Sequence, residues 1–166
     1  MRYLLLLAAI SLSGCGTRPF APTEYPLRDG LIAPMAVNGQ AQVSNGQAQT
    51  GPVIVYSYGG TKLSSDLNSI TEVMVQQTRK ELAKAARPAG GSSKTIELKV
   101  NSLLSEYAGF HWNSNLKFDA KLGDGKTISM TVPHTSGFLA QDLNGCIAES
   151  VMTLLNDQRV RTYLAQ

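Results

Sequence analysis

The sequence has few charged residues and only two cysteines, and both shortages exclude whole classes of protein. Charged side chains make up 16% of the chain, and the formal net charge is only +3. So weak a charge argues against nucleic acid as a partner and against attraction to an acidic surface through charge alone. The two cysteines, Cys15 and Cys146, are too few for a disulfide framework. The length of 166 residues fits a single domain with a modest apolar core.

The sequence also lacks the short motifs that carry common chemistries. It contains no Gly-x-Ser-x-Gly, no P-loop, no His-Glu-x-x-His and no Cys-x-x-Cys. His134 and Ser136 lie near each other in a polar stretch, which leaves a Ser–His hydrolase as the weakest of three functional hypotheses. We therefore expect no catalytic residues, no metal site, no cofactor and no enzymatic activity.

The longest apolar run, residues 4–12, follows a single cation at Arg2. It is too short to cross a bilayer, which needs about 20 apolar residues, but it has the layout of a secretory signal. The run ends in residues 12–15, Leu-Ser-Gly-Cys, which resemble the bacterial lipobox. The resemblance implies that residues 1–14 are a cleaved signal peptide and that Cys15 carries a diacylglyceryl group and an N-linked acyl chain such as palmitate.

The expected location follows from this anchor. Two or more acyl chains give stable membrane attachment, whereas one chain holds a protein only marginally. The residue after Cys15 is Gly16 and not the Asp that retains lipoproteins of enteric-type bacteria at the inner membrane. We therefore expect a protein anchored in the outer membrane, with its domain facing the periplasm.

Residues 15–51 have the composition of a tether. They contain four prolines and a near repeat in which residues 38–44, NGQAQVS, are followed by residues 45–51, NGQAQTG. Two units are too few for a solenoid, and Pro-containing polar segments of this kind often serve as spacers. The sequence favours a flexible tether with some strand character over residues 35–43. The alternative is a hairpin that turns at residues 44–46, because Asn-Gly suits a tight turn.

The globular domain is expected over residues 52–166. A β-branched and aromatic run at 53–58 predicts a strand, and alternating apolar and polar residues predict three more. Helical periodicity predicts one helix between the candidate N-caps at 64–66 and the Pro-Gly stop at 87–91, and a second over 139–155. A last short turn carries Val160, Tyr163 and Leu164. The three further predicted strands lie at residues 96–100, 116–122 and 128–132.

These elements follow the order β-α-β-β-β-α. Strands that alternate cleanly have one face in water, and parallel neighbours need long crossover connections. The sequence therefore predicts a two-layer α+β domain, in which two helices pack on one face of a mostly antiparallel sheet of about four strands.

Cys146 has no intramolecular disulfide partner if Cys15 is lipidated. It shares an apolar helical stripe with Leu143, Ile147 and Val151. A reactive thiol needs a neighbouring cation that lowers its pKa, and nothing in the sequence places either histidine beside it. We expect Cys146 to be a small buried hydrophobic residue.

The C-terminal segment resembles the YajG-type family of small outer-membrane lipoproteins. Residues 147–155 fit the pattern Ile-Ala-acidic-x-Val-x-Ser/Thr-aliphatic-Leu, and residues 157–164 fit Asp-x-x-aliphatic-x-x-aromatic-aliphatic. This chain joins the two patterns directly, whereas the family has about two more helical turns between them. Most matching positions are core residues, so the resemblance implies a fold and transfers no active site.

The feature that stands out functionally is the aromatic segment at residues 107–112. It holds Tyr107, Phe110 and the only tryptophan, Trp112, between two predicted strands. Such rings can fold back onto the core or form a contact surface, and large aromatic side chains supply much of the energy of interfaces. We predict these three residues as a candidate partner contact.

Two functions remain after these exclusions. The first is a non-enzymatic lipoprotein that acts as an accessory or binding component of a cell-envelope complex, with an envelope protein of unknown identity as its partner. The alternative is an auxiliary lipoprotein of a transport or lipid-handling system. An open apolar groove would favour the alternative, and cleanly alternating strands leave little apolar surface for one.

Overall fold

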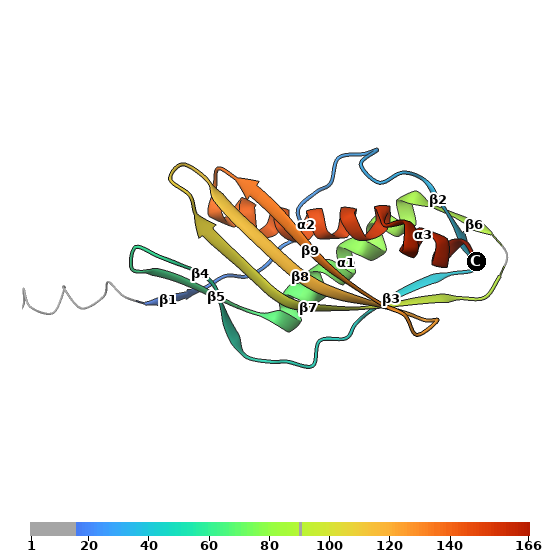
Figure 1. Ribbon diagram of the computed structural model, residues 1–166, viewed down its shortest axis with the longest axis horizontal. Helices are drawn as coiled ribbons and strands as arrows, with labels where there is room; N and C mark the ends of the chain where they lie inside the picture. The colour runs from blue at the N-terminus through green and yellow to red at the C-terminus, as the bar shows by residue number, and fades with distance from the viewer. Residues whose placement is uncertain (1–15, 90) are drawn as a thin grey trace, which may run out of the picture.

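The computed structural model, which describes residues 16–89 and 91–166, is a mixed α+β fold (Figure 1). The predicted signal peptide at 1–14 and the lipidation site Cys15 lie outside the described residues. The described helices are α1 (Leu67–Ala85), α2 (Leu139–Asn156) and α3 (Gln158–Ala165). The described strands are β1 (Thr17–Pro19), β2 (Met35–Asn38), β3 (Ala41–Asn45), β4 (Pro52–Tyr58), β5 (Thr61–Asp66), β6 (Ala86–Ala89), β7 (Lys94–Tyr107), β8 (Trp112–Leu122) and β9 (Thr127–Ser136).

Seven of these strands form one mixed sheet. Its order is β1-β5-β4-β7-β8-β9, and β3 also pairs with β7. Strands β7, β8 and β9 are an antiparallel meander, whereas β3 and β4 both run parallel to β7. The remaining strands, β2 and β6, pair in parallel as a separate two-stranded sheet.

The predicted four-stranded, mostly antiparallel sheet with two helices is therefore wrong. The prediction disfavoured parallel pairing because such pairs need a long crossover, and the chain provides that crossover in the hairpin β4–β5 followed by α1. Of the three candidate N-caps at residues 64–66, Asp66 caps α1 by accepting from the Ser69 N–H at 3.0 Å, and all three lie in β5 (Thr61–Asp66). The last turn is a third helix, α3.

Part of the segment predicted as a tether, residues 15–51, is folded into the domain, and the strand character expected over residues 35–43 is confirmed. Strands β2 and β3 lie within it, and three of their side chains, Met35, Val37 and Val43, are buried in the core. Strand β3 pairs with the first half of β7 from Ala41 to Asn45. The segment therefore contributes core contacts, because apolar side chains alternate along these short strands and point inward.

Residues 20–34, which we call the N-terminal strap, lie across the helices. The Thr23 N–H donates to Asn144 Oδ1 on α2 at 3.0 Å, and Gln77 Nε2 on α1 donates to the Tyr25 carbonyl at 2.6 Å. Further along, Asn156 Nδ2 donates to the Leu31 carbonyl at 2.9 Å. These contacts fasten the strap over α1 and α2.

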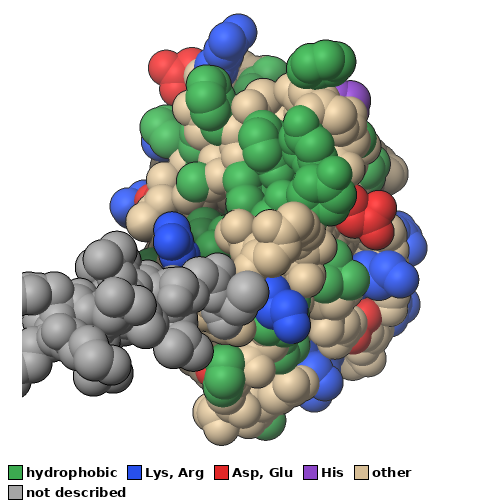
Figure 2. Space-filling view, turned by 90° about the vertical axis from the view of Figure 1, so that its left-hand side faces the viewer, with side chains coloured by type: hydrophobic (Ala, Val, Ile, Leu, Met, Phe, Trp, Pro, Cys, Tyr) green, Lys and Arg blue, Asp and Glu red, His purple; other side chains and the backbone are tan. Residues whose placement is uncertain are grey.

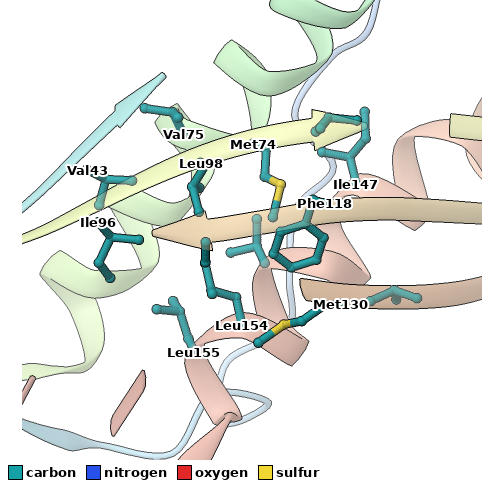
Figure 3. Close-up of a cluster of buried hydrophobic side chains, with 14 of the residues drawn as sticks. Val43, Met74, Val75, Ile96, Leu98, Phe118, Met130, Ile147, Leu154 and Leu155 are labelled. Atoms are coloured by element: carbon teal, nitrogen blue, oxygen red, sulfur yellow. The ribbon is translucent and has the colours of Figure 1, made fainter. Parts of the chain in front are cut away.

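The core lies between the two long helices and one face of the sheet (Figure 3). The predicted strands at 96–100, 116–122 and 128–132 and the helix at 139–155 are confirmed, because the expected inward residues are buried. Phe118 on β8 lies near the middle of this layer and is fully buried. Among the labelled side chains, the sheet contributes Val43, Ile96, Leu98, Phe118 and Met130, and the helices contribute Met74, Val75, Ile147, Leu154 and Leu155.

A gap in strand pairing opens in the middle of β7. Strand β3 pairs with β7 from Lys94 to Leu98, and the next partner on that edge, β4, reaches it only at Ser105. Two side chains satisfy the backbone between them: the Val100 N–H donates to Thr71 Oγ1 at 3.1 Å, and Gln47 Nε2 donates to the Val100 carbonyl. Buried peptide groups need such partners, which explains why an amide side chain is buried here.

We predict that Gln47→Ala lowers the free energy of unfolding by about 1–3 kcal/mol, because the buried Val100 carbonyl loses its donor. Gln40 is the matched control, since it occupies the same position in the first copy of the repeat but its side chain is exposed. Gln40→Ala should leave the stability nearly unchanged. Thermal and urea unfolding measure both, and equal losses for the two variants would contradict this account of the gap.

Candidate functional site: an aromatic surface at one end of the sheet

Several segments that are far apart in the sequence meet at one end of the main sheet (Figure 1). Strand β1 begins there, with Thr17 opposite Lys62 of β5, and the β4–β5 turn follows Tyr58. Because β4 runs parallel to β7, the β7–β8 turn at residues 108–111 lies at the same end. Strand β9 also finishes here, with Ser136 opposite Trp112. We call this the proximal end; the C-terminus and the β8–β9 turn lie at the distal end.

Three aromatic rings from neighbouring strands contact one another at the proximal end. The ring centroids of Tyr58 and Tyr107 are 5.0 Å apart, and those of Tyr107 and Trp112 are 5.2 Å apart, both in tilted geometry. Tyr107 and Trp112 are direct cross-strand partners, on the same side of the sheet as the buried pair Ser105 and Ser114. Tilted ring pairs at this spacing are favourable beyond the area they bury, so the rings hold three strand ends together.

Two phenylalanines extend this cluster into solvent. Phe110 sits on the β7–β8 turn after Gly109, whose φ of +81° suits glycine, and its side chain is 98% exposed. Phe138 precedes α2 and is 69% exposed. We call Tyr58, Tyr107, Phe110, Trp112 and Phe138 the aromatic surface. Figure 2, which faces the proximal end, shows hydrophobic side chains gathered over the upper part of this face.

The two phenylalanines of the aromatic surface, Phe110 and Phe138, are exposed and lie outside the core. Burying a phenylalanine contributes about 1.5–3 kcal/mol relative to leaving it exposed, and the fold forgoes that contribution at both Phe110 and Phe138. Apolar patches of this kind mark sites of interaction with a protein or a membrane. The aromatic surface is therefore the candidate functional site among the described residues.

The structure places the three predicted contact residues at this site. Tyr107 and Trp112 touch each other, and Phe110 projects from the turn between them. Trp112 is half-buried. The sequence left open whether its ring packs onto the core or forms a contact surface, and one part of the ring does each. Tyr58 and Phe138 were not predicted, because strand order and register bring them here: Tyr58 lies beside Tyr107, and Phe138 follows Ser136, the partner of Trp112.

A buried carboxylate supports the aromatic surface from below. Asp142 in the first turn of α2 is fully buried, and its Oδ2 accepts hydrogen bonds from the hydroxyl groups of Ser105 (2.7 Å) and Ser114. Since Ser105 and Ser114 come just before Tyr107 and just after Trp112, this contact fixes the start of α2, and so Phe138, over the same strand pair.

Cys146 lies one helical turn after Asp142 and has no accessible surface. Burial, followed by the charge of Asp142, raises the pKa of the Cys146 thiol from 9.0 to about 12. The thiolate is the reactive form, and a thiol with this pKa is almost entirely protonated at neutral pH. The prediction that Cys146 is a buried hydrophobic residue is confirmed.

His134 and Ser136 do not form a catalytic pair. They lie two residues apart on β9, and no hydrogen bond joins them in the described part of the chain. The His134 ring packs instead against Gly145 of α2, where a Cβ would come within 2.3 Å of its Nε2 atom. Residues 16–89 and 91–166 contain no group of three or more His, Cys, Asp or Glu side chains placed to hold a metal ion. None of the helices described there is long and apolar enough to span a membrane.

A pocket of about 560 Å³ lies at the distal end, between the β8–β9 turn and α3. Its apolar wall includes Leu122, Ile128 and Tyr163. Arg159, which also lines it, is paired with Asp157 at 2.7 Å. The charge at its rim is thus already partnered, and the apolar wall is its main feature.

We predict that Asp142→Ala destabilises the domain by at least about 1–3 kcal/mol, because two buried hydroxyl groups lose their acceptor. Asp119→Ala is the matched control: Asp119 also accepts from two side chains, Asn101 at 2.8 Å and Ser129 at 2.6 Å, but on the open face of the sheet. Water can replace that acceptor, so the loss there should be smaller. Chemical unfolding followed by Trp112 fluorescence measures both, and a larger loss for Asp119→Ala would contradict the role given to Asp142.

Comparison with known proteins shows a likeness of fold. No family model matches the chain, and no curated protein matches its sequence. Among solved structures, the fold is similar to the crystal structure of protein XCC0632 from Xanthomonas campestris, of family DUF330. The TM-score is 0.54 at 15% identity, over 83% of this chain and 92% of that one. A match over 83% of the chain is longer than residues 52–166 alone, so it extends into the segment expected as a tether.

Proposed function

We propose that the protein is a non-enzymatic lipoprotein, anchored in the outer membrane through Cys15, whose periplasmic domain serves as an accessory component of a cell-envelope complex. One observation supports this proposal: residues 12–15, which resemble a lipobox, are followed closely by the fold, since β1 begins at Thr17. A lipid anchor so close to the first strand holds the whole domain at the membrane surface.

The N-terminal strap supports the same arrangement. After β1 the chain does not extend away from the domain but crosses both helices, and the Glu24 carboxylate pairs with Lys80 of α1 at 2.7 Å. Arg161 of α3 then donates to the Pro34 carbonyl at 2.8 Å. The domain therefore cannot move far from its anchor without breaking these contacts.

The surface available to a protein partner is the open face of β7, β8 and β9. Side chains on this face carry both signs of charge, as in the pair of Lys121 and Glu97 and in the exposed Lys99 and Lys117. In the described sheet β9 pairs only with β8, so its outer edge has free backbone groups. Complementary charge and free strand edges are two common means of recognising proteins.

The distal pocket favours a second function, that of an auxiliary lipoprotein in transport or lipid handling. Its wall of Leu122, Ile128 and Tyr163 is apolar and wide enough for part of an acyl chain. The pocket lies at the end of the sheet opposite β1, so a ligand held there would be presented away from the bilayer.

Replacing Cys15 tests the anchor. Cys15→Ala should abolish incorporation of a labelled fatty acid and move the protein out of the membrane fraction, because no other residue receives the acyl chains. Cys146→Ala is the control, since it removes the other cysteine and should leave labelling and fractionation unchanged. Label that persists in Cys15→Ala, or that disappears in Cys146→Ala, would show that the anchor is misplaced.

Cross-linking in cells tests the accessory role. A photoreactive residue in place of Lys117, on the open sheet face, should give a discrete adduct with one envelope protein, because the partner is expected to bind there. The same residue in place of Ala83, exposed on α1, serves as the control and should not give that adduct. Identical background from both positions would argue against a partner on the open face.

A further inference from the structure

We propose that the aromatic surface inserts into the headgroup layer of the same bilayer that holds the lipid anchor, so that the domain contacts the membrane at two places. This proposal rests on the lipidation of Cys15 proposed above and names the occupant of the candidate site. It assigns Tyr107, Phe110 and Trp112 to lipid rather than to the envelope protein for which the sequence suggested them.

The chain between the proposed anchor at Cys15 and the first strand is very short. Only Gly16 separates Cys15 from Thr17, and two residues span at most about 7 Å. Thr17 is therefore held close to the bilayer surface. It pairs with Lys62 of β5, which pairs in turn with Ser57 of β4. Neighbouring strands lie about 4.8 Å apart, so the end of β4 with Tyr58 is roughly 10 Å to the side of β1.

The side chains at the proximal end have the chemistry of a membrane interface. Tyrosine and tryptophan prefer the membrane–water interface; here the exposed rings of Tyr58 and Tyr107 can take that position, whereas the indole Nε1 of Trp112 is buried. Phe110, at 98% exposure on the β7–β8 turn, can enter deeper. Arg18 of β1 and Lys62 of β5 are also exposed at the proximal end, where they can meet lipid phosphates. Aromatic residues combined with cations are typical of surfaces that lie in the interface.

A folded protein does not fit between β1 and the bilayer. An α-helix with its side chains is about 10–12 Å across, which is thicker than the reach of about 7 Å that one intervening residue allows. A folded partner inserted between the proximal end and the bilayer would need a longer connection than Gly16 provides. The open sheet face and the distal end have no such restriction.

Trp112 provides a direct test because it is the only tryptophan in the chain. The mature lipidated protein is reconstituted into vesicles of phosphatidylethanolamine and phosphatidylglycerol, with a quenching spin label either near the headgroup or deep in the acyl chains. We expect a blue shift of Trp112 emission on reconstitution and strong quenching by the shallow label. Flotation of the vesicles checks separately that the protein remains anchored.

Two sets of variants distinguish insertion of the aromatic surface into lipid from attachment through the anchor alone. Phe110→Ala combined with Phe138→Ala should remove most of the quenching while the protein still floats with the vesicles. Leu31→Ala is the control, because Leu31 is 45% exposed but lies beside the C-terminal end of α2, away from the proximal end. Both phenylalanines are exposed, so circular dichroism should show unchanged unfolding for the double variant.

Lengthening the chain between Cys15 and β1 is the second way to distinguish insertion from attachment through the anchor alone. About ten Gly and Ser residues inserted after Gly16 give a reach of roughly 18 Å, which frees the domain from an imposed contact. Quenching should persist in this insertion variant and disappear when the two alanines are added. Loss of quenching on insertion alone would show that the surface has no affinity of its own for lipid, and would overturn the proposal.

The remaining outcomes also decide between occupants. If the wild-type protein floats with the vesicles but neither label quenches Trp112, the proposed insertion of the aromatic surface is wrong, while the lipid anchor is supported. If the protein does not float, the proposed lipid anchor is wrong, and the proposed insertion, which depends on that anchor, is wrong as well. In cells, a photoreactive residue in place of Phe110 should give adducts with lipid. A discrete protein adduct there would overturn the proposal in favour of a protein partner.

Discussion

The architecture depends on one long strand, β7, that shares a single edge between two parallel partners. Strand β8 pairs along its other edge over nearly its full length, so β3 and β4 must divide what remains. The unpaired stretch between them is satisfied by Gln47 and Thr71. Because β4 is parallel to β7, its last residue comes to lie beside the end of β7. The aromatic surface is therefore a result of strand direction as much as of the aromatic segment itself.

Sequence patterns were sufficient where burial repeats regularly and were not sufficient where pairing is non-local. Strands β7 to β9 alternate between apolar and polar residues over many positions, and α2 presents a continuous apolar stripe. Strands β1 and β3 are short, and each pairs with a strand that is distant in the sequence, β5 and β7 respectively. Gln47 illustrates the difficulty: a buried glutamine in a repeat looks like spacer composition until its acceptor, Val100, is known.

The residues of the candidate site also fall into two groups, those that the local sequence predicts and those that only strand pairing brings together. Tyr107, Phe110 and Trp112 were found because they are adjacent in sequence. Tyr58 and Phe138 join them only through register. Asp142 gave no signal, since a fully buried carboxylate is uncommon and its two serine partners belong to different strands. Such a polar group in the core restricts how the helix can sit on the sheet, which a purely apolar contact would not do.

Strand β1 also determines how the domain resists mechanical load. It runs parallel to β5, away from the proximal end, and its pairing continues into the hydrogen bond from the Phe20 N–H to the Ser64 carbonyl at 2.7 Å. A pull on the proposed lipid anchor would act along the axis of β1, so it would shear all of these hydrogen bonds together instead of breaking them one by one. Behind β1, the salt bridge from Glu24 to Lys80 would carry the load next. Although β1 is only three residues long, its direction would let the proposed anchor withstand tension between the membrane and the domain.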